Sequence, residues 1–89
     1  MLLALSDDYT ASIWNVPSET TWPEDPHVIL EGHTRQVNGG AFLGDESHVI
    51  TGSADRSLRI WRTSDGVQTA KYECDKSVRH VCAFYLLIL

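Results

Sequence analysis

A nine-residue phrase occurs twice in this chain of 89 residues. Residues 6–14 read SDDYTASIW and residues 53–61 read SADRSLRIW, so the two tryptophans, Trp14 and Trp61, stand 47 residues apart. Self-similarity at a period of about 20–50 residues is typical of repeat architectures, in which one supersecondary unit is stacked several times. Because such a unit cannot bury its apolar face alone, we expect the chain to be a piece of a larger structure.

Short apolar runs alternate with turn signals along the whole sequence, and no stretch shows the i, i+3, i+4 recurrence of a long helix. The predicted strands cover residues 2–6, 10–16, 27–30, 37–43, 48–53, 57–63, 67–74 and 78–87. A long proline-rich loop is predicted at residues 17–26, and the Gly39-Gly40 pair predicts a position of close packing within a strand. Strands at spacings of about ten residues predict an all-β fold.

The composition narrows the function classes. Apolar residues make up 43% of the chain, which is typical of a globular protein, and the formal net charge is −5. Nucleic-acid binders usually carry a basic stripe, whereas the Arg and Lys residues here are scattered, so we expect no nucleic-acid partner. The four histidines show no metal-ligand spacing and no phosphate-binding loop occurs, so we predict neither a metal site nor a cofactor.

The cysteines and the chain ends suggest an intracellular protein. Cys74 and Cys82 lie in strand-like runs without a CxxC motif, which favours reduced thiols over the alternatives of a disulfide or a metal pair. The N-terminus lacks the basic region of a signal peptide. The apolar run VCAFYLLIL at 81–89 is shorter than the roughly 20 residues that a membrane-spanning helix needs, so we expect no membrane association.

Two segments carry a family resemblance, EGHTRQVNGGAF at 31–42 and VITGSADRSLRIW at 49–61. Together they resemble the WD40-repeat family of β-propellers, whose blades are four-stranded antiparallel sheets. The resemblance implies that residues 1–89 are one WD-repeat region, with 1–16 ending one repeat, 27–63 forming a complete repeat, and 67–89 starting a further, truncated one. We therefore expect a partial propeller, about one complete blade plus parts of two neighbours.

The third piece of the chain also aligns with the complete repeat. SVRHVCA at 77–83 can be laid on QVNGGAF at 36–42 with a shift of 41 residues. This correspondence places the end of the sequence at the beginning of a further blade.

The resemblance further implies a buried hydrogen-bond chain through four side chains, His33, Thr51, Asp55 and Trp61. The indole N–H would donate to the hydroxyl, the hydroxyl to the imidazole and the imidazole to the carboxylate, so that no polar group is buried without a partner. A fully satisfied network of this kind rigidifies the blade. The first copy of the phrase keeps Asp8 and Trp14 but has Ala4 at the hydroxyl position, so its network is incomplete.

The implied function is a non-enzymatic scaffold that binds other proteins, with the propeller completed by further blades or by self-assembly. By the family pattern, Gln36, Asn38 and Arg79 occupy partner-binding positions, with ordinary solvated loop residues as the alternative interpretation. Trp22 is a further binding candidate, because an aromatic in a proline-rich loop is exposed by default. Alternatively, Trp22 folds back to cover the blade.

Two other hypotheses remain open. The first is that the chain is a truncated, non-functional fragment. The second is a hydrolase in which Ser53, His33 and Asp55 serve as nucleophile, base and orienting acid. No Gly-x-Ser-x-Gly motif is present, and the structural network already accounts for the histidine and the aspartate, so the sequence favours a non-enzymatic protein.

Overall fold

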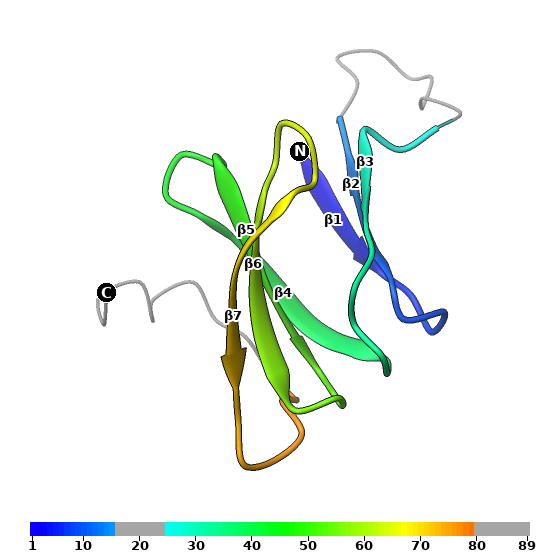
Figure 1. Cartoon of the computed structure of the whole chain (residues 1–89). Helices are drawn as coiled ribbons and strands as arrows, with labels where there is room; N and C mark the ends of the chain where they lie inside the picture. The colour runs from blue at the N-terminus through cyan, green and yellow to red at the C-terminus, as the bar shows by residue number, and fades with distance from the viewer. Residues whose placement is uncertain (16–24, 80–89) are drawn as a thin grey trace.

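The computed structural model describes residues 1–15 and 25–79, which form two antiparallel β-sheets and contain no helix (Figure 1). The first sheet has the order β1-β2-β3, with β1 at Leu2–Leu5, β2 at Ala11–Trp14 and β3 at Val28–Leu30. The second sheet has the order β4-β5-β6-β7, with β4 at Val37–Leu43, β5 at His48–Ser53, β6 at Ser57–Arg62 and β7 at Gln68–Glu73. The all-β class and the partial propeller are confirmed, with one antiparallel sheet of four strands and one of three within the described residues.

Seven of the eight predicted strands are present within the described residues, with small differences at their ends. The largest is at β2, which ends at Trp14 rather than at residue 16. Val78 and Arg79, which open the predicted eighth strand, are not in a strand, and the rest of that prediction lies outside the described residues. Most of the predicted loop at 17–26 also lies outside them.

The four-stranded sheet is not the same stretch of chain as the sequence repeat. It spans residues 37–73, whereas the repeat was placed at 27–63. The difference arises because β3 pairs with β2 of the first sheet, in the register Ala11↔Leu30 and Ile13↔Val28. Each repeat therefore contributes its first strand to the preceding sheet and borrows its last strand from the following repeat.

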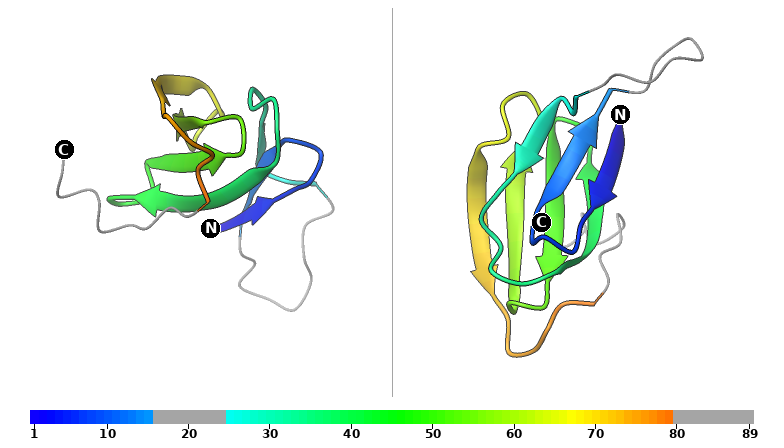
Figure 2. Two further views of the ribbon diagram at one scale, coloured as in Figure 1. Left: turned by 90° about the horizontal axis from the view of Figure 1, so that it is seen from below. Right: turned by 90° about the vertical axis from the view of Figure 1, so that its right-hand side faces the viewer.

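The core lies between the two sheets (Figure 2). Both sheets contribute fully buried side chains to one cluster, namely Ala11, Ile13, Leu30, Val37, Val49 and Trp61. In β2 the buried Ala11 and Ile13 alternate with the half-buried Ser12 and Trp14, as the two-residue period of a strand requires. The indole of Trp61 is the largest of these fully buried side chains.

Close packing between the sheets depends on Gly40 in β4. A Cβ atom added there would lie 2.6 Å from Leu3 Cδ2 in β1 and 3.3 Å from the carbonyl oxygen of Ile50. The contact with the first sheet is to the end of the Leu3 side chain, which would have to shift to admit any larger residue, whereas the backbone contact lies within the second sheet. The position of close packing predicted from the glycine pair is therefore confirmed.

The described residues contain no helix that is long and apolar enough to cross a membrane.

Candidate functional site

Four side chains from separate segments of the second sheet form a continuous hydrogen-bond chain. They are His33, which precedes β4, Thr51 on β5, Asp55 in the β5–β6 turn and Trp61 on β6. Trp61 Nε1 donates to Thr51 Oγ1 at 2.8 Å, and His33 Nε2 lies 2.7 Å from the same oxygen. On the other side of the ring, His33 Nδ1 lies 2.9 Å from Asp55 Oδ2. The chain thus ties the segment before β4 to both β5 and β6.

The proton positions in this chain follow from counting donors. The oxygen of Thr51 accepts the Trp61 N–H, so its own single proton is free to go to Nε2 of a neutral His33. The Nδ1–H of that ring then donates to Asp55. Burial lowers the pKa of His33 and outweighs the Asp55 carboxylate, which acts in the opposite direction. The lowered pKa favours the neutral ring. Every buried polar atom of the chain has a partner in this tautomer.

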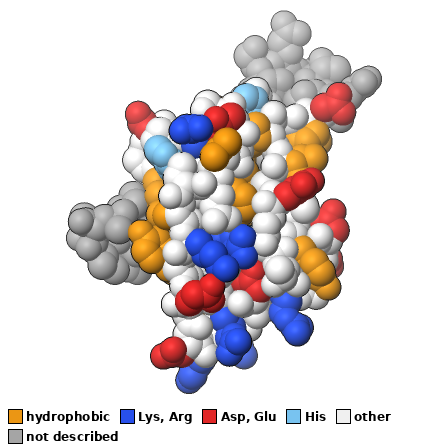
Figure 3. Space-filling model, viewed as in Figure 1, with side chains coloured by type: hydrophobic (Ala, Val, Ile, Leu, Met, Phe, Trp, Pro, Cys, Tyr) orange, Lys and Arg blue, Asp and Glu red, His pale blue; other side chains and the backbone are white. Residues whose placement is uncertain are grey.

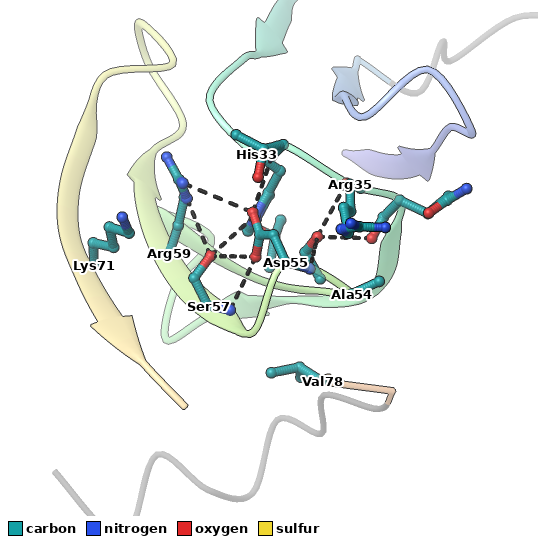
Figure 4. A network of polar contacts seen from close by, with 12 residues as sticks. His33, Arg35, Ala54, Asp55, Ser57, Arg59, Lys71 and Val78 are labelled. Atoms are coloured by element: carbon teal, nitrogen blue, oxygen red, sulfur yellow. Dashed lines mark hydrogen bonds and ion pairs between the residues drawn. The ribbon is translucent and has the colours of Figure 1, made fainter. Parts of the chain in front are cut away.

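Asp55 accepts more hydrogen bonds than the family pattern alone implied (Figure 4). The Ser57 hydroxyl donates to Oδ1 at 2.6 Å and the Ser57 backbone N–H donates to it at 2.9 Å, while the Thr34 backbone N–H reaches Oδ2 at 3.0 Å. Burial by itself would raise the pKa of Asp55, but the hydrogen bonds from Ser57, His33 and Thr34 outweigh burial and hold that pKa well below its usual range. The carboxylate is therefore ionised throughout the physiological pH range.

Arg59 extends the network toward the outer strand. Its Nε donates to Ser57 Oγ at 3.3 Å, its Nη2 lies 3.7 Å from Asp55 Oδ2, and its Nη1 donates to Gln68 Oε1 on β7 at 3.0 Å. Sequence reasoning missed both Ser57 and Arg59. The Asp-x-Ser spacing at 55–57 could have identified the serine, because a hydroxyl two residues after an aspartate is a common turn element.

Gly32, directly before His33, leaves room for the side chains of the hydrogen-bond network to pack against its backbone. Its φ is +156°, and a Cβ atom there would lie 2.8 Å from Arg59 Nη1 and 3.1 Å from Trp61 Cη2. The guanidinium and the indole therefore occupy the space that any other residue would fill. The Gly-His pair of the sequence thus has a steric reason as well as a hydrogen-bonding one.

The alternative hydrolase arrangement does not assemble around Ser53. Its hydroxyl lies 3.0 Å and 2.8 Å from the carbonyl oxygens of Arg35 and Gln36, to which it donates, and it accepts the backbone N–H of Asp55 at 3.1 Å. The hydroxyl that faces His33 belongs to Thr51 instead. Thr51 is fully buried, so a substrate carbonyl has no route to its oxygen.

The partner-binding candidates lie at the end of the sheet that carries the β5–β6 turn. Gln36, Asn38 and Arg79 are all exposed. The backbone N–H of Ala54 donates to the Gln36 carbonyl at 3.0 Å, and Asn38 Nδ2 donates to the Val78 carbonyl at 3.0 Å. The structure therefore brings Gln36 and Asn38 to one end of the blade, with the residue before Arg79 beside them.

The same end of the molecule carries a mixture of charges. Figure 3 shows Lys and Arg side chains toward the lower end, below the middle of the sheet, interspersed with Asp and Glu.

Trp22, the remaining binding candidate, lies outside the described residues. In residues 1–15 and 25–79, no group of three or more His, Cys, Asp or Glu side chains is placed to hold a metal ion.

Comparison with known proteins identifies the family. The family model described as "WD domain, G-beta repeat" matches residues 24–62, the stretch that contains all four members of the hydrogen-bond chain. Residues 24–62 are a WD40 repeat. The chain is also 36% identical over 66 residues to Ribosome assembly protein 4 of Saccharomyces cerevisiae, an alignment that covers 74% of this chain and 12% of that protein.

Two further relatives show similar coverage. MST50-interacting protein 11 of Pyricularia oryzae is 32% identical over 72 residues, covering 81% of this chain and 23% of that protein. The Ribosome biogenesis protein WDR12 homolog of Trichoplax adhaerens is 34% identical over 77 residues, covering 83% of this chain and 16% of that protein. The chain thus spans less than a quarter of the length of each of these relatives.

Proposed function

We propose that this WD40-repeat chain is a non-enzymatic, intracellular protein–protein interaction module that acts as a segment of a β-propeller in a larger protein or assembly. Gln36, Asn38 and Arg79 form part of its contact surface. Support comes from the relatives, of which one is named for an interaction with another protein and two for ribosome assembly or biogenesis. These names differ among themselves, so they support a scaffold role without selecting one pathway.

The observation that carries the proposal is the contrast between a fixed backbone and free side-chain ends at one end of the blade. Gln36 is exposed, yet its carbonyl oxygen accepts hydrogen bonds from Ala54 and Ser53. A side chain that projects from an immobile backbone loses less conformational entropy on binding than one on a free loop. This end of the sheet therefore suits recognition by a second protein.

Site-specific photo-crosslinking tests the proposal. A benzoylphenylalanine placed at Gln36 is expected to capture a partner in the source cells, whereas the same probe at the exposed Ser64, in the turn at the opposite end of β6, is expected to capture much less. The captured protein is then purified and its affinity measured directly. The double variant Gln36→Ala, Arg79→Ala is expected to weaken binding by about tenfold or more with an unchanged melting temperature, and Ser64→Ala to leave binding unchanged.

Asn38 is left intact in this test because its side chain also donates to Val78. Equal capture from both probe positions, or full affinity in the double variant, would rule out this surface.

A further inference from the structure

The seven Lys and Arg residues of the chain fall into two groups. Three of them lie beside a carboxylate, with N···O distances of 3.7, 2.7 and 2.9 Å in the pairs Arg59–Asp55, Arg62–Asp65 and Lys71–Glu73. The other four are exposed and form no ion pair with any residue that the structure describes. These four side chains, which we call the basic patch, are Arg35, Arg56, Lys76 and Arg79.

The fully buried Ser53, the last residue of β5, is bonded to the backbone at or beside three members of the patch. Its hydroxyl donates to the carbonyl of Arg35 at 3.0 Å. Its own carbonyl accepts the N–H of Arg56 at 3.2 Å, and also the N–H of Val78, directly before Arg79, at 3.0 Å. Residues that are far apart in the sequence are therefore held around one serine.

Lys76, the fourth member, lies beside the same β5–β6 turn. The hydroxyl of the neighbouring Ser77 donates to the Ala54 carbonyl at 3.2 Å, and the Cys74 N–H donates to the Arg56 carbonyl at 2.7 Å. The segment that follows β7 is thus bonded along this turn. The patch lies toward the lower end of the molecule in Figure 3.

The carboxylates near the patch do not neutralise it. Asp75 is the exposed acid beside it in the sequence, whereas the Asp55 side chain is only 5% exposed and already accepts several hydrogen bonds. Glu73 is paired within its own strand, and the exposed Asp7 and Asp8 belong to the β1–β2 turn of the other sheet. Four cations therefore form a positive surface on a chain whose formal net charge is −5.

Exposed cations on a fixed backbone are suited to binding carboxylates. Three of the four are arginines, whose planar fork of N–H donors matches the two oxygens of a carboxylate. A ligand at the patch breaks no ion pair among the described residues, whereas a ligand at Arg62 would have to displace Asp65. The hydrogen bonds to the β5–β6 turn also reduce the backbone entropy that is lost on binding.

We propose that the basic patch binds an acidic segment, rich in Asp and Glu, of a protein partner. The inference rests on the proposed function and names the chemistry of the partner. It adds Arg35, Arg56 and Lys76 to the contact surface, none of which the family pattern indicated. The exposed Gln36, beside Arg35, can exchange further hydrogen bonds with the backbone of the bound peptide.

A peptide suits this surface better than the other common polyanion, nucleic acid. Nucleic-acid binders usually carry a basic stripe, whereas the patch is confined to one turn and the segments bonded to it. Outside the patch, the chain has twelve Asp and Glu residues against three Lys and Arg residues. A phosphate backbone that continued past the patch would be repelled by these acids, whereas the acidic stretch of a peptide can end where the patch ends.

Fluorescence anisotropy on the full chain tests the proposal with two synthetic peptides. The probe is a fluorescein-labelled peptide of about ten residues in which Glu and Asp alternate with Gly, and the control carries Gln and Asn in place of the acids. The chain is expected to bind the acidic peptide about tenfold or more tightly than the neutral one. Raising NaCl from about 0.05 M to about 0.5 M is expected to remove most of this preference, because salt screens exposed charges.

Two double variants of matched composition separate the patch from the net charge. Arg35→Gln, Lys76→Gln removes two patch cations, whereas Arg62→Gln, Lys71→Gln removes one arginine and one lysine that already have partners. The first is expected to weaken binding of the acidic peptide about fivefold or more, and the second about twofold at most.

A charge-preserving swap and a melting curve supply the controls. Arg35→Lys, Lys76→Arg keeps both charges and is expected to retain the affinity for the acidic peptide. All four positions replaced in the two double variants are exposed, so melting temperatures close to that of the wild-type chain are expected for every variant.

Three outcomes would overturn the proposal. The first is equal affinity for the acidic and neutral peptides. The second is equal weakening in the two double variants, which would be an effect of net charge alone. The third is binding of an oligothymidylate of similar length at least as tightly as the acidic peptide, which would assign the patch to nucleic acid.

The proposed function has a separate readout in the crosslinking at Gln36. Protein capture at Gln36 without a preference for the acidic peptide would rule out the acidic partner and leave the interaction module standing. A preference for the acidic peptide without capture at Gln36 would support the basic patch and count against the contact surface around Gln36.

Discussion

The two copies of the repeated phrase build almost the same turn. In the first, Asp8 Oδ1 accepts the Thr10 backbone N–H at 3.1 Å and its hydroxyl at 2.6 Å. In the second, Asp55 Oδ1 accepts the equivalent groups of Ser57 at 2.9 Å and 2.6 Å. The residue in the middle of each turn has a positive φ, 77° and 67° respectively. Four to five residues of sequence are enough to specify this turn, wherever it stands in the chain.

Beyond the turn, the two copies differ. Trp61 is 1% exposed and donates across the sheet to Thr51, which contacts His33. Trp14 is half-buried and donates to Ser12 on its own strand at 2.9 Å, because Ala4 stands at the hydroxyl position. The comparison shows that the phrase by itself encodes a turn. The buried hydrogen-bond chain also requires a histidine and a hydroxyl from outside the phrase.

Among the predicted effects, the largest difference between the two copies is in the free energy of unfolding that is lost when each tryptophan is replaced. Trp61→Ala is expected to lower the free energy of unfolding by more than about 3 kcal/mol, because it leaves a large cavity and removes the donor to Thr51. Trp14→Ala is expected to cost less than half as much, since its side chain is only partly buried. Urea denaturation of both variants measures the difference. Equal losses would mean that the hydrogen-bond chain adds nothing to the second copy.

The hydroxyl position offers a sharper version of the same comparison. Thr51→Val is expected to cost about 2–3 kcal/mol, because the Trp61 N–H and His33 Nε2 both lose their buried partner while the side-chain volume hardly changes. The reciprocal change Ala4→Thr is expected to alter stability by less than about 1 kcal/mol, since no histidine completes the chain there. Urea midpoints at constant m-value distinguish the two. A neutral Thr51→Val would contradict the network.

Acid should also affect the two copies differently. The pKa of His33 is lowered by burial from its ordinary value of 6.5, so the unfolded chain binds more protons than the folded one just below that pH. The contribution of His33 is therefore complete above pH 6.5 and is lost as the pH falls below it. Asp55, whose pKa is lowered, adds a second loss only below 3.8.

Melting temperatures between about pH 7.5 and pH 5 test this expectation. The wild-type chain is expected to lose stability across that range, and His33→Gln, less stable throughout, is expected to show a shallower dependence because it lacks the buried imidazole. The turn of the first copy is expected to add no pH dependence in this range. Hydrogen bonds from Thr10 and Ser6 lower the pKa of its exposed Asp8 below 3.8. An identical pH dependence in both proteins would show that His33 does not titrate with folding.

The smallest predicted effect is the one that the two copies share. Tyr9→Gly and Arg56→Gly each remove a side chain from a backbone with positive φ. Relief of that strain is partly offset by the greater entropy of glycine in the unfolded chain, so each is expected to stabilise by a few tenths to about 1 kcal/mol. Thermal melts should give similar shifts for both. A large difference between them would show that the turns are not equivalent in energy.

Much of the second sheet was predictable because its signals are local. The strands at 37–43 and 48–53 have the bounds predicted from apolar runs and flanking turns. The contacts among His33, Thr51 and Asp55 have the order that the family resemblance implied. The roles of Ser53 and Arg59 were harder to see, because the serine bonds to backbone carbonyls and the arginine reaches a glutamine on the neighbouring strand. Every residue has a backbone carbonyl, so the sequence does not show which carbonyls accept side-chain hydrogen bonds.

By itself the sequence determined the all-β class, the positions of the strands and the aspartate turns, since each rests on residues within a few positions of one another. The tertiary structure decided which strands share a sheet, placing β3 beside β2 and β7 beside β6. It also set how deeply Trp14 is buried, since this side chain is half-buried whereas Trp61 is 1% exposed. The physical reason is that side-chain alternation tells a strand which face to bury but not which neighbour to bond, and that choice is made by packing across the whole molecule.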